Sequence, residues 1–434
     1  MATITPTSFP LSKPVNCSKC RKEIVLFDPL GSQYYVCPSC YSYIYQPDSI
    51  DAYVKDDLKK PNLTPVLPLG TVGELKDAEF KVIAYLEKKE AGTSYRWVEY
   101  ILYHPQKGYA TLAEYEGHWS FIAGEDFYPD FKDVSAIGDE ATYNNLQFKL
   151  YNKYKPQVTA MLGEADWDVV NEKIHAAEFI NPPFMIVRET PSNPSIPSFY
   201  LGEYMEPEAI AKAFQVDPSN FPSVVGIGAI QPSKFAERWS ALLYMGLLSI
   251  AIVLAIHMVV DYITPPKEVL NDNFSITYQS DKGGDDFKPF STGSFKLDRT
   301  AALSFELYSP VDNNWMEASI VLVNEVDNRT WEVSKSIEYY HGYEDGENWS
   351  EGSKEETVML SSIPAGKYHL NVYPASGDKS ISNLNIKALA EGSLWRNTMI
   401  TILLLCLYPL YCWYRMRNIE KQRWMNSDFS PFEE

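Results

Sequence analysis

The stretch WSALLYMGLLSIAIVLAIHMVV, residues 239–260, contains no Asp, Glu, Lys or Arg. A second apolar run, LWRNTMITILLLCLYPLYCWY, occupies residues 394–414. A helix of about 20 residues covers the roughly 30 Å of hydrocarbon in a bilayer. Neither run has the polar face of a helix that packs into a soluble core. The sequence therefore predicts two transmembrane helices, in contact with membrane lipids, that divide the chain.

The charges beside these runs predict how the chain is oriented. Basic residues near the ends of transmembrane helices stay in the cytoplasm. Residues 1–16 are polar and lack the apolar core of a secretory signal, so we expect the first run to act as an uncleaved anchor. Both termini, including the tail 415–434, are then cytoplasmic, and residues 261–393 are extracytoplasmic. The basic residues before the first run and after the second are Lys234, Arg238, Arg415, Arg417, Lys421 and Arg423.

The composition favours β structure in the soluble parts. The chain has 30 Tyr, 20 Phe and 29 Pro, which suits short strands and turns better than long helices. Its formal net charge is −19 at pH 7, which argues against a nucleic-acid partner because phosphate neutralisation needs a basic surface. We therefore expect a mainly β multidomain membrane protein.

Four cysteines near the N-terminus have the spacing of a zinc ribbon. Cys17 and Cys20 form one C-x2-C pair, and Cys37 and Cys40 form a second. Two such pairs supply the four thiolate ligands of a tetrahedral zinc ion, with no position left for catalysis. Disulfides would need an oxidising compartment, whereas the orientation above places these residues in the cytoplasm. We expect a structural zinc ribbon at residues 1–46 and a Pro-rich linker at 47–66.

Residues 67–230 alternate between strand-like segments and turns, which predicts a cytoplasmic β-barrel-like region. Glu99, Glu114, Glu116 and His118 lie close together in sequence and could form an acid–base group. Alternation on strands sends neighbouring side chains to opposite faces, so surface charges on a hairpin are the alternative. The second interpretation is favoured here, and the sequence predicts no catalytic residue.

This region resembles an uncharacterised bacterial family catalogued as a domain of unknown function, over Leu67–Phe214. The resemblance implies a bacterial envelope setting and the inner membrane, and members are often encoded near polyamine aminopropyltransferase-like and phage-shock-type proteins. It brings no catalytic residues with it. The positions that carry it are Gly70, Gly73, Phe80, Val82, Tyr95, Trp97, Glu99, Tyr100, Leu102, Gly108, Tyr109, Leu112 and Trp119.

Residues 270–390 contain short alternating segments separated by turns, which predicts an extracytoplasmic antiparallel β-sandwich. One segment gathers aromatic and acidic residues that could stack on a glycan or bind a cation such as Ca²⁺. The alternative is a solvated loop whose aromatic side chains rest on the sandwich. The residues concerned are Tyr343, Glu344, Asp345, Glu347 and Trp349.

The functional prediction is a non-enzymatic, membrane-anchored binding, scaffold or sensor protein of the bacterial envelope, in stress or polyamine-linked systems. We expect a protein partner on the cytoplasmic side. Two alternatives remain open. One is an enzyme or accessory subunit of polyamine or lipid metabolism, and the other is a structural subunit of a two-span membrane homo-oligomer.

Overall fold

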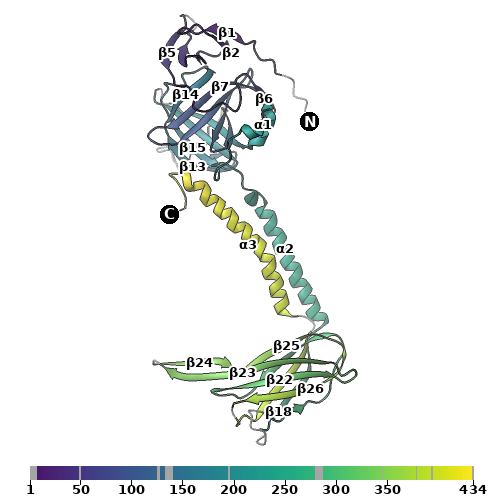
Figure 1. Cartoon of the computed structure of the whole chain (residues 1–434). Coiled ribbons are helices and arrows are strands. Elements are labelled where there is room, and N and C mark those ends of the chain that lie inside the picture. The colour runs from purple at the N-terminus through teal and green to yellow at the C-terminus, as the bar shows by residue number, and fades with distance from the viewer. Residues whose placement is uncertain are drawn as a thin grey trace. The chain divides into compact units, whose positions relative to one another are not determined.

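The computed structural model describes residues 7–47, 50–124, 128–131, 140–193, 196–278, 287–344, 346–377, 379–391 and 394–432 (Figure 1). The chain forms two compact units. One consists of Met1–Ser240 with Tyr411–Glu434, and the other is Ala241–Leu410. Both are built mainly from antiparallel strands, as the composition predicts, and two long helices run through the boundaries between them.

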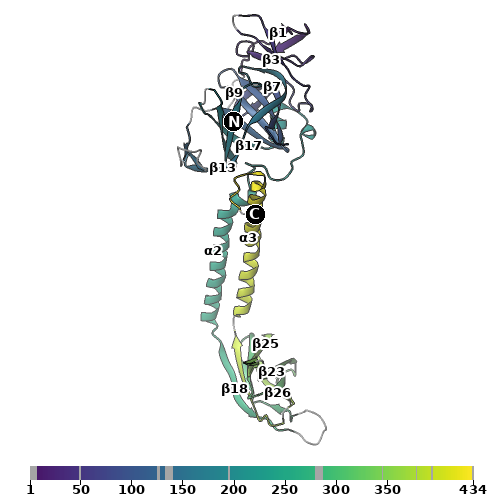
Figure 2. The ribbon, with the colours of Figure 1, turned by 90° about the vertical axis from the view of Figure 1, so that its left-hand side faces the viewer.

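The first unit contains seventeen strands among its described residues, one short α-helix and two 3₁₀ turns, at Pro218–Asn220 and Trp424–Asn426 (Figure 2). The strands and helix are β1 (Lys13–Asn16), β2 (Glu23–Leu26), β3 (Tyr34–Val36), β4 (Ser42–Tyr45), β5 (Tyr53–Asp57), β6 (Val72–Leu75), β7 (Ala78–Glu90), β8 (Arg96–His104), β9 (Gly108–Tyr115), β10 (His118–Gly124), β11 (Asp130–Phe131), β12 (Glu140–Tyr143), β13 (Leu146–Tyr154), β14 (Pro156–Ala165), β15 (Ile174–Asn181), β16 (Phe184–Pro191), β17 (Ser198–Met205) and α1 (Pro207–Phe214).

Most of these strands belong to one curled antiparallel sheet, in the order β11-β12-β13-β15-β16-β17-β10-β9-β8-β7-β14-β3-β4-β5. β13 and β14 lie eight strands apart in this order, yet only Lys155 separates them in the chain. The sheet must therefore curve until these two strands approach each other. Side chains that point inward from opposite walls then share one interior, as the rings of Trp97 on β8 and Tyr154 on β13 do, with centroids 5.5 Å apart.

The outer face of β7 to β10 is covered as well. Val82, Tyr100 and Trp119 form a buried cluster with Ile210 and Phe214 of α1. A strand of this sheet therefore has one row of side chains in a packed core and the other row in the interior of the curl. Because neither row faces bulk water, alternation along these strands does not distinguish buried from exposed positions.

The four-cysteine segment is continuous with the same sheet. β3 pairs with β14, with Val36 opposite Gly163, and β4 and β5 extend the sheet beyond it. The range 47–66, expected to be a linker, thus contains strand β5. The attachment is also fixed by Glu164 of β14, whose carboxylate accepts hydrogen bonds from the backbone N–H groups of Phe27 and Asp28 at 2.8 and 2.5 Å.

The second unit contains two antiparallel sheets that share a core. One sheet has the order β18-β27-β21-β25, and the other has β19-β26-β22-β23-β24 with β20 paired to β26. Alternate residues of β22 and β27 are buried in that core, including Ile320, Leu322 and Ile386. Its strands are β18 (Lys267–Ser275), β19 (Phe290–Ser291), β20 (Phe295–Leu297), β21 (Ala301–Tyr308), β22 (Asn314–Asn324), β23 (Thr330–Glu344), β24 (Glu347–Ser353), β25 (Glu355–Ile363), β26 (Gly366–Ser376) and β27 (Asn383–Glu391).

The two apolar runs are helical, as predicted. They form α2 (Lys234–Ile263) and α3 (Trp395–Arg423), which are long and apolar enough to cross a membrane. Both are longer than the runs themselves, and α3 includes the first part of the expected tail 415–434. Its added turns, RMRNIEKQR at 415–423, are rich in Arg, Lys, Glu and Gln, which are good helix formers.

Gly163 marks the place where β14 lies between β7 and β3. Its φ is +89°, and a Cβ atom there would lie 2.0 Å from the backbone oxygen of Ile83. We expect Gly163→Ala to be more destabilising than Gly92→Ala, by about 1–3 kcal/mol, because backbone atoms cannot move aside as a side chain can. Gly92 is the matched control, since its φ is +87° and its Cβ would meet no atom within 4 Å. Thermal unfolding of the full-length variants in detergent measures the difference, and equal losses would show that the close approach is absent.

Candidate functional site

The four cysteines lie together at the ends of two hairpin loops. Their sulfur atoms are all within 4.8 Å of one another, with 3.7 Å between Cys17 and Cys40 and 3.6 Å between Cys20 and Cys37. All four are free thiols. The cluster is compatible with a metal site, which agrees with the predicted ligand set.

The two cysteine loops repeat the same backbone geometry. The N–H of Arg21 donates to the carbonyl of Cys17 at 3.0 Å, and the N–H of Tyr41 donates to that of Cys37 at 2.9 Å. Arg21 and Tyr41 both have positive φ, 63° and 57°. Each tight turn brings its two thiols to the same side, which is why the spacing of the cysteines alone indicates the site.

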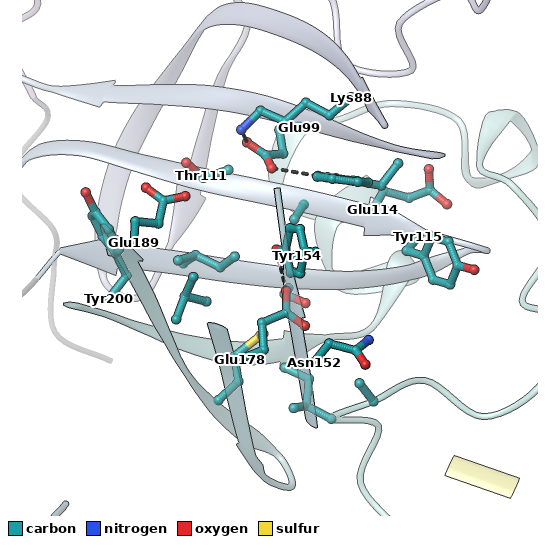
Figure 3. Close-up of a pocket in the computed structure, with 18 of the residues that line it drawn as sticks. Lys88, Glu99, Thr111, Glu114, Tyr115, Asn152, Tyr154, Glu178, Glu189 and Tyr200 are labelled. Atoms are coloured by element: carbon teal, nitrogen blue, oxygen red, sulfur yellow. Dashed lines mark hydrogen bonds and ion pairs between the residues drawn. The ribbon is translucent and has the colours of Figure 1, made fainter. Parts of the chain in front are cut away.

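A second candidate site is a cavity of about 790 Å³ enclosed by the curled sheet (Figure 3). Its described lining includes nine acidic residues but only three lysines and no arginine. Nine Tyr and Trp side chains also contribute to its walls. The volume is in the range of small-molecule sites, and the lining combines aromatic surface with ionisable groups. The acidic residues are Glu90, Glu99, Glu114, Glu116, Asp166, Glu172, Glu178, Glu189 and Asp428.

One wall of the cavity carries an ion pair. Lys88 of β7 contacts the Glu99 carboxylate of the adjacent strand β8 at 2.6 Å, and the other carboxylate oxygen of Glu99 accepts a hydrogen bond from the Trp97 indole at 2.7 Å. Lys88 and Glu99 are only 15% and 18% exposed. Burial lowers the pKa of Lys88, but the carboxylates of Glu99 and Glu189 outweigh it and leave the pKa raised. Lys88 is therefore charged and already neutralises one carboxylate.

The facing wall presents two more carboxyl groups. Glu178 of β15 accepts a hydrogen bond from the Tyr154 hydroxyl at 2.7 Å, and Glu189 lies on the neighbouring strand β16 (Figure 3). Burial raises the pKa of Glu178 to about 7; the hydrogen bond from Tyr154 opposes this rise, and the charges of Glu99 and Glu189 add to it. Burial also raises the pKa of Glu189, although Lys88 opposes it. Near neutral pH the Glu178 carboxyl group is therefore partly protonated.

Comparison with protein families connects this cavity to a known sequence pattern. Residues 68–207 match the family described as Domain of unknown function (DUF4178). This part of the chain is a DUF4178 domain. The match confirms a domain of unknown function at residues 68–207, within the range Leu67–Phe214 inferred from the sequence; the bacterial envelope setting stays a prediction. Glu99, Glu178, Glu189 and Lys88 all lie inside the DUF4178 domain, whereas the segments 227–230 and 425–428 of the cavity wall lie outside it.

Comparisons with whole proteins add no functional information. No curated protein matches the chain. Among solved structures, infectious bursal disease virus of the Gx strain is 10% identical and aligns over 89% of this chain and 74% of its own, with a TM-score of 0.18. A structure of carbohydrate-binding modules from the β-sandwich superfamily is 8% identical over 70% of this chain and 97% of its own, with a TM-score of 0.15. Scores this low do not support a shared fold.

Three of the four residues considered as an acid–base group, Glu99, Glu114 and His118, occupy enclosed positions in the DUF4178 domain, whereas Glu116 is exposed in the turn between β9 and β10. Glu114 accepts a hydrogen bond from the N–H of Gly117 at 2.6 Å and is buried. His118 is also buried, with its ring nitrogens 3.3 Å from the Tyr204 hydroxyl and 3.1 Å from the Val225 carbonyl oxygen. The interpretation of Glu99, Glu114 and His118 as surface charges is therefore wrong, because both faces of this sheet are covered.

Glu178 and Glu189 were not predicted as site residues. A signal for them exists in the sequence, since each interrupts an apolar strand: IHAAEFIN for β15 and FMIVRETP for β16. A carboxyl group within such a strand is rarely buried unless it has a partner. Glu178 and Glu189 face Glu99 and Lys88 because the sheet curls. No local sequence pattern predicts this curl.

The residues predicted as an outer ligand loop lie on a paired hairpin. Tyr343 on β23 is opposite Asn348 on β24, and Glu344 is opposite Glu347. Tyr343 is 71% exposed and Trp349 is 44% exposed, with the Trp349 ring against Gly342. Asp345 lies outside the described residues. Ligand binding at this hairpin stays a prediction.

Proposed function

We propose that the chain is a membrane-anchored binding protein that holds a small organic cation inside the cavity of its DUF4178 domain. One observation carries this proposal: Glu99, Glu178 and Glu189 line one cavity, and Lys88 forms its ion pair with Glu99. Among the described residues, neither Glu178 nor Glu189 forms an ion pair with Lys or Arg within 4 Å. An enclosed carboxylate without a countercharge is unfavourable, so a proton or a cation must compensate it.

The spacing of the acids favours an extended cation over a metal ion. Within the described part of the chain, the cysteine cluster is the one group of three or more His, Cys, Asp or Glu ligand atoms that all lie within 4.8 Å of one another. The carboxylates of the cavity therefore do not converge on a single ion. A linear amine with charges at both ends fits better, because each ammonium can reach a different carboxylate.

The aromatic lining supports the same class of ligand. The rings of Trp97 and Tyr154 pack edge to face at 5.5 Å, between the Glu99 wall and the Glu178 wall. Aromatic faces attract cations and also cover the methylene groups of an aliphatic amine. This provides structural support for the expected link to polyamines.

An enzymatic function of the same cavity is the second candidate. A carboxyl group with a pKa of about 7, such as that of Glu178, is suited to general acid or base catalysis near neutral pH. The hydroxyl of Tyr154 is positioned to hold that carboxyl group. Chemical conversion of the bound amine would distinguish catalysis from binding alone.

The anchoring that we propose uses both apolar helices as transmembrane spans. Basic residues in the first turns of α2 and the last turns of α3 support a cytoplasmic location for both termini and an extracytoplasmic location for residues 261–393. The free thiols of the cysteine cluster are consistent with a reducing compartment for the first unit.

The cysteine cluster, in this proposal, holds a structural zinc ion. A tetrahedral ion with Zn–S bonds of about 2.3 Å places its sulfur atoms about 3.8 Å apart. The separations of 3.7 and 3.6 Å for two of the pairs fit that geometry. Four thiolates leave no open coordination position, so the ion would stabilise the hairpins and perform no reaction.

Zinc binding is tested by metal analysis of the purified full-length protein. We expect one zinc per chain by inductively coupled plasma mass spectrometry, and loss of most of it in Cys37→Ser, because three thiolates bind much more weakly. Cys412→Ser is the control, since Cys412 is buried in α3 and far from the cluster in sequence. Iron in place of zinc, or full zinc occupancy in Cys37→Ser, would contradict the assignment.

The orientation is tested with single cysteines added at exposed sites of the full chain. Asn348→Cys lies on β24 and Lys212→Cys lies on α1. We expect a membrane-impermeant maleimide to label only Asn348→Cys in intact cells, and both variants after the membrane is permeabilised. The unaltered chain gives the background from its own thiols. Preferential labelling of Lys212→Cys in intact cells would reverse the proposed topology.

Ligand binding is tested by calorimetry of the full-length protein with spermidine and 1,4-diaminobutane. We expect both to bind and 1,4-butanediol, which has a similar length and no charge, to give no heat. Glu178→Gln should weaken binding about 10- to 100-fold, because it removes a charge-assisted contact worth about 1.5–3 kcal/mol. Glu208→Gln on the exposed surface of α1 makes the same charge change outside the cavity and should have no effect.

The same titration repeated across pH tests the role of Glu178. Its carboxyl group takes up a proton as the pH falls through about 7, while the amines of the probe stay protonated. Affinity should therefore fall below pH 7, and this fall should be smaller in Glu178→Gln. Mass spectrometry of the recovered amine shows whether it is unchanged, and a converted product would favour the enzyme. Absence of heat with either amine across this pH range would refute the proposed ligand class.

A further inference from the structure

Two segments that adjoin the long helices form part of the cavity wall. Residues 227–230 lie just before α2, and residues 425–428 follow the end of α3. Both belong to the first unit together with the adjacent ends of the helices, residues 234–240 and 411–423. The cavity is therefore enclosed partly by the chain that enters one helix and leaves the other.

Arg423 at the end of α3 joins these two segments. Its side chain is 1% exposed, and its guanidinium donates hydrogen bonds to the carbonyl oxygens of Gly228, Ala229 and Gln231 at 2.8, 3.0 and 2.8 Å. Its Nε atom also contacts Glu420, one turn earlier in α3. The planar guanidinium fixes several directions at once, which lysine cannot do. The end of α3 is thus bound to the segment that leads into α2.

The same end of α3 is bound to β13, a strand of the cavity wall. The hydroxyl of Tyr151 donates to the backbone carbonyl of Arg423 at 2.9 Å, and the Ser427 hydroxyl donates to the carbonyl of Tyr151 at 2.5 Å. The Tyr151 ring also packs on Trp424, with centroids 5.4 Å apart. Tyr154, which holds Glu178, lies three residues further along this strand.

We propose that a ligand in the cavity makes the adjacent ends of α2 and α3 less mobile, and that the contacts of Arg423 and Tyr151 transmit this effect. This inference rests on the proposed binding function. It adds that the ends of the two helices regulate the affinity of the cavity for its ligand. A ligand that contacts the wall restricts the segments 227–231 and 423–428, and the restricted segments hold the ends of α2 and α3. Because linkage is reciprocal, contacts that hold the helix ends also favour the ligand.

Hydrogen exchange of the full-length protein in phosphatidylcholine nanodiscs tests the coupling, with spermidine as the probe. Amides of residues 228–240 and 415–428 should exchange at least about fivefold more slowly when the probe is bound, the lower end of ordinary allosteric coupling. In Arg423→Lys this slowing should be largely lost and affinity for the probe reduced. The matched control Lys421→Gln changes an exposed basic side chain two residues away and should behave like the original chain.

A cavity-filling variant separates failure of the coupling from failure of the proposed ligand. Thr111 lines the cavity from β9, so Thr111→Phe places a ring inside it without any ligand (Figure 3). We expect the same slowing of exchange at the two helix ends in this variant. Spermidine binding without slower exchange would overturn the coupling and leave the binding function intact. If spermidine does not bind, the proposed ligand class fails, and unchanged exchange in Thr111→Phe would overturn the coupling as well.

Discussion

Enclosure of many more carboxyl groups than ammonium groups, nine against three, is the constraint on which the cavity of the first unit depends. Lys88 and Glu99 neutralise each other across adjacent strands, whereas Glu178 has a tyrosine hydroxyl as its partner. Burial of Glu178 disfavours its ionised form and raises its pKa to about 7. A fold that only needed stability would place apolar side chains at this position, because an apolar replacement of buried charge is often neutral or stabilising. These carboxyl groups are the strongest argument for the proposed ligand.

The curl of the sheet is what brings these groups together. β7 and β8 lie at one side of the interior and β15 and β16 at the other, with β9, β10 and β17 between them in the sheet. The cavity lining then continues into the backbone segments beside the two long helices. There the Arg423 guanidinium donates hydrogen bonds to the carbonyl oxygens of Gly228, Ala229 and Gln231. The proposed binding and the proposed anchoring thus involve the same walls.

Some of this structure was predictable from the sequence, because the features concerned are local. Two C-x2-C pairs indicate the cysteine cluster through turn geometry alone. The length and the apolar composition of residues 239–260 and 394–414 indicate α2 and α3. The cavity was not predictable in the same way. Residues 99 and 178 are far apart in the chain. They face each other only because the sheet curves until β13 and β14, which are distant in the strand order, lie close together. The alternation of side chains along strands also led to the wrong prediction that Glu99 is a surface charge. That argument assumes that one face of a sheet is in water.

The pairing of β3 with β14 has a consequence for how the chain divides into parts. The DUF4178 match ends at residue 207 and begins at residue 68, so it excludes β3, β4 and β5. A fragment with those limits would have open backbone N–H and C=O groups along β14, and it would lack the segment 425–428 that covers the cavity. Unpaired edges are prone to add strands from other molecules. The DUF4178 match therefore covers only part of the compact unit to which it belongs.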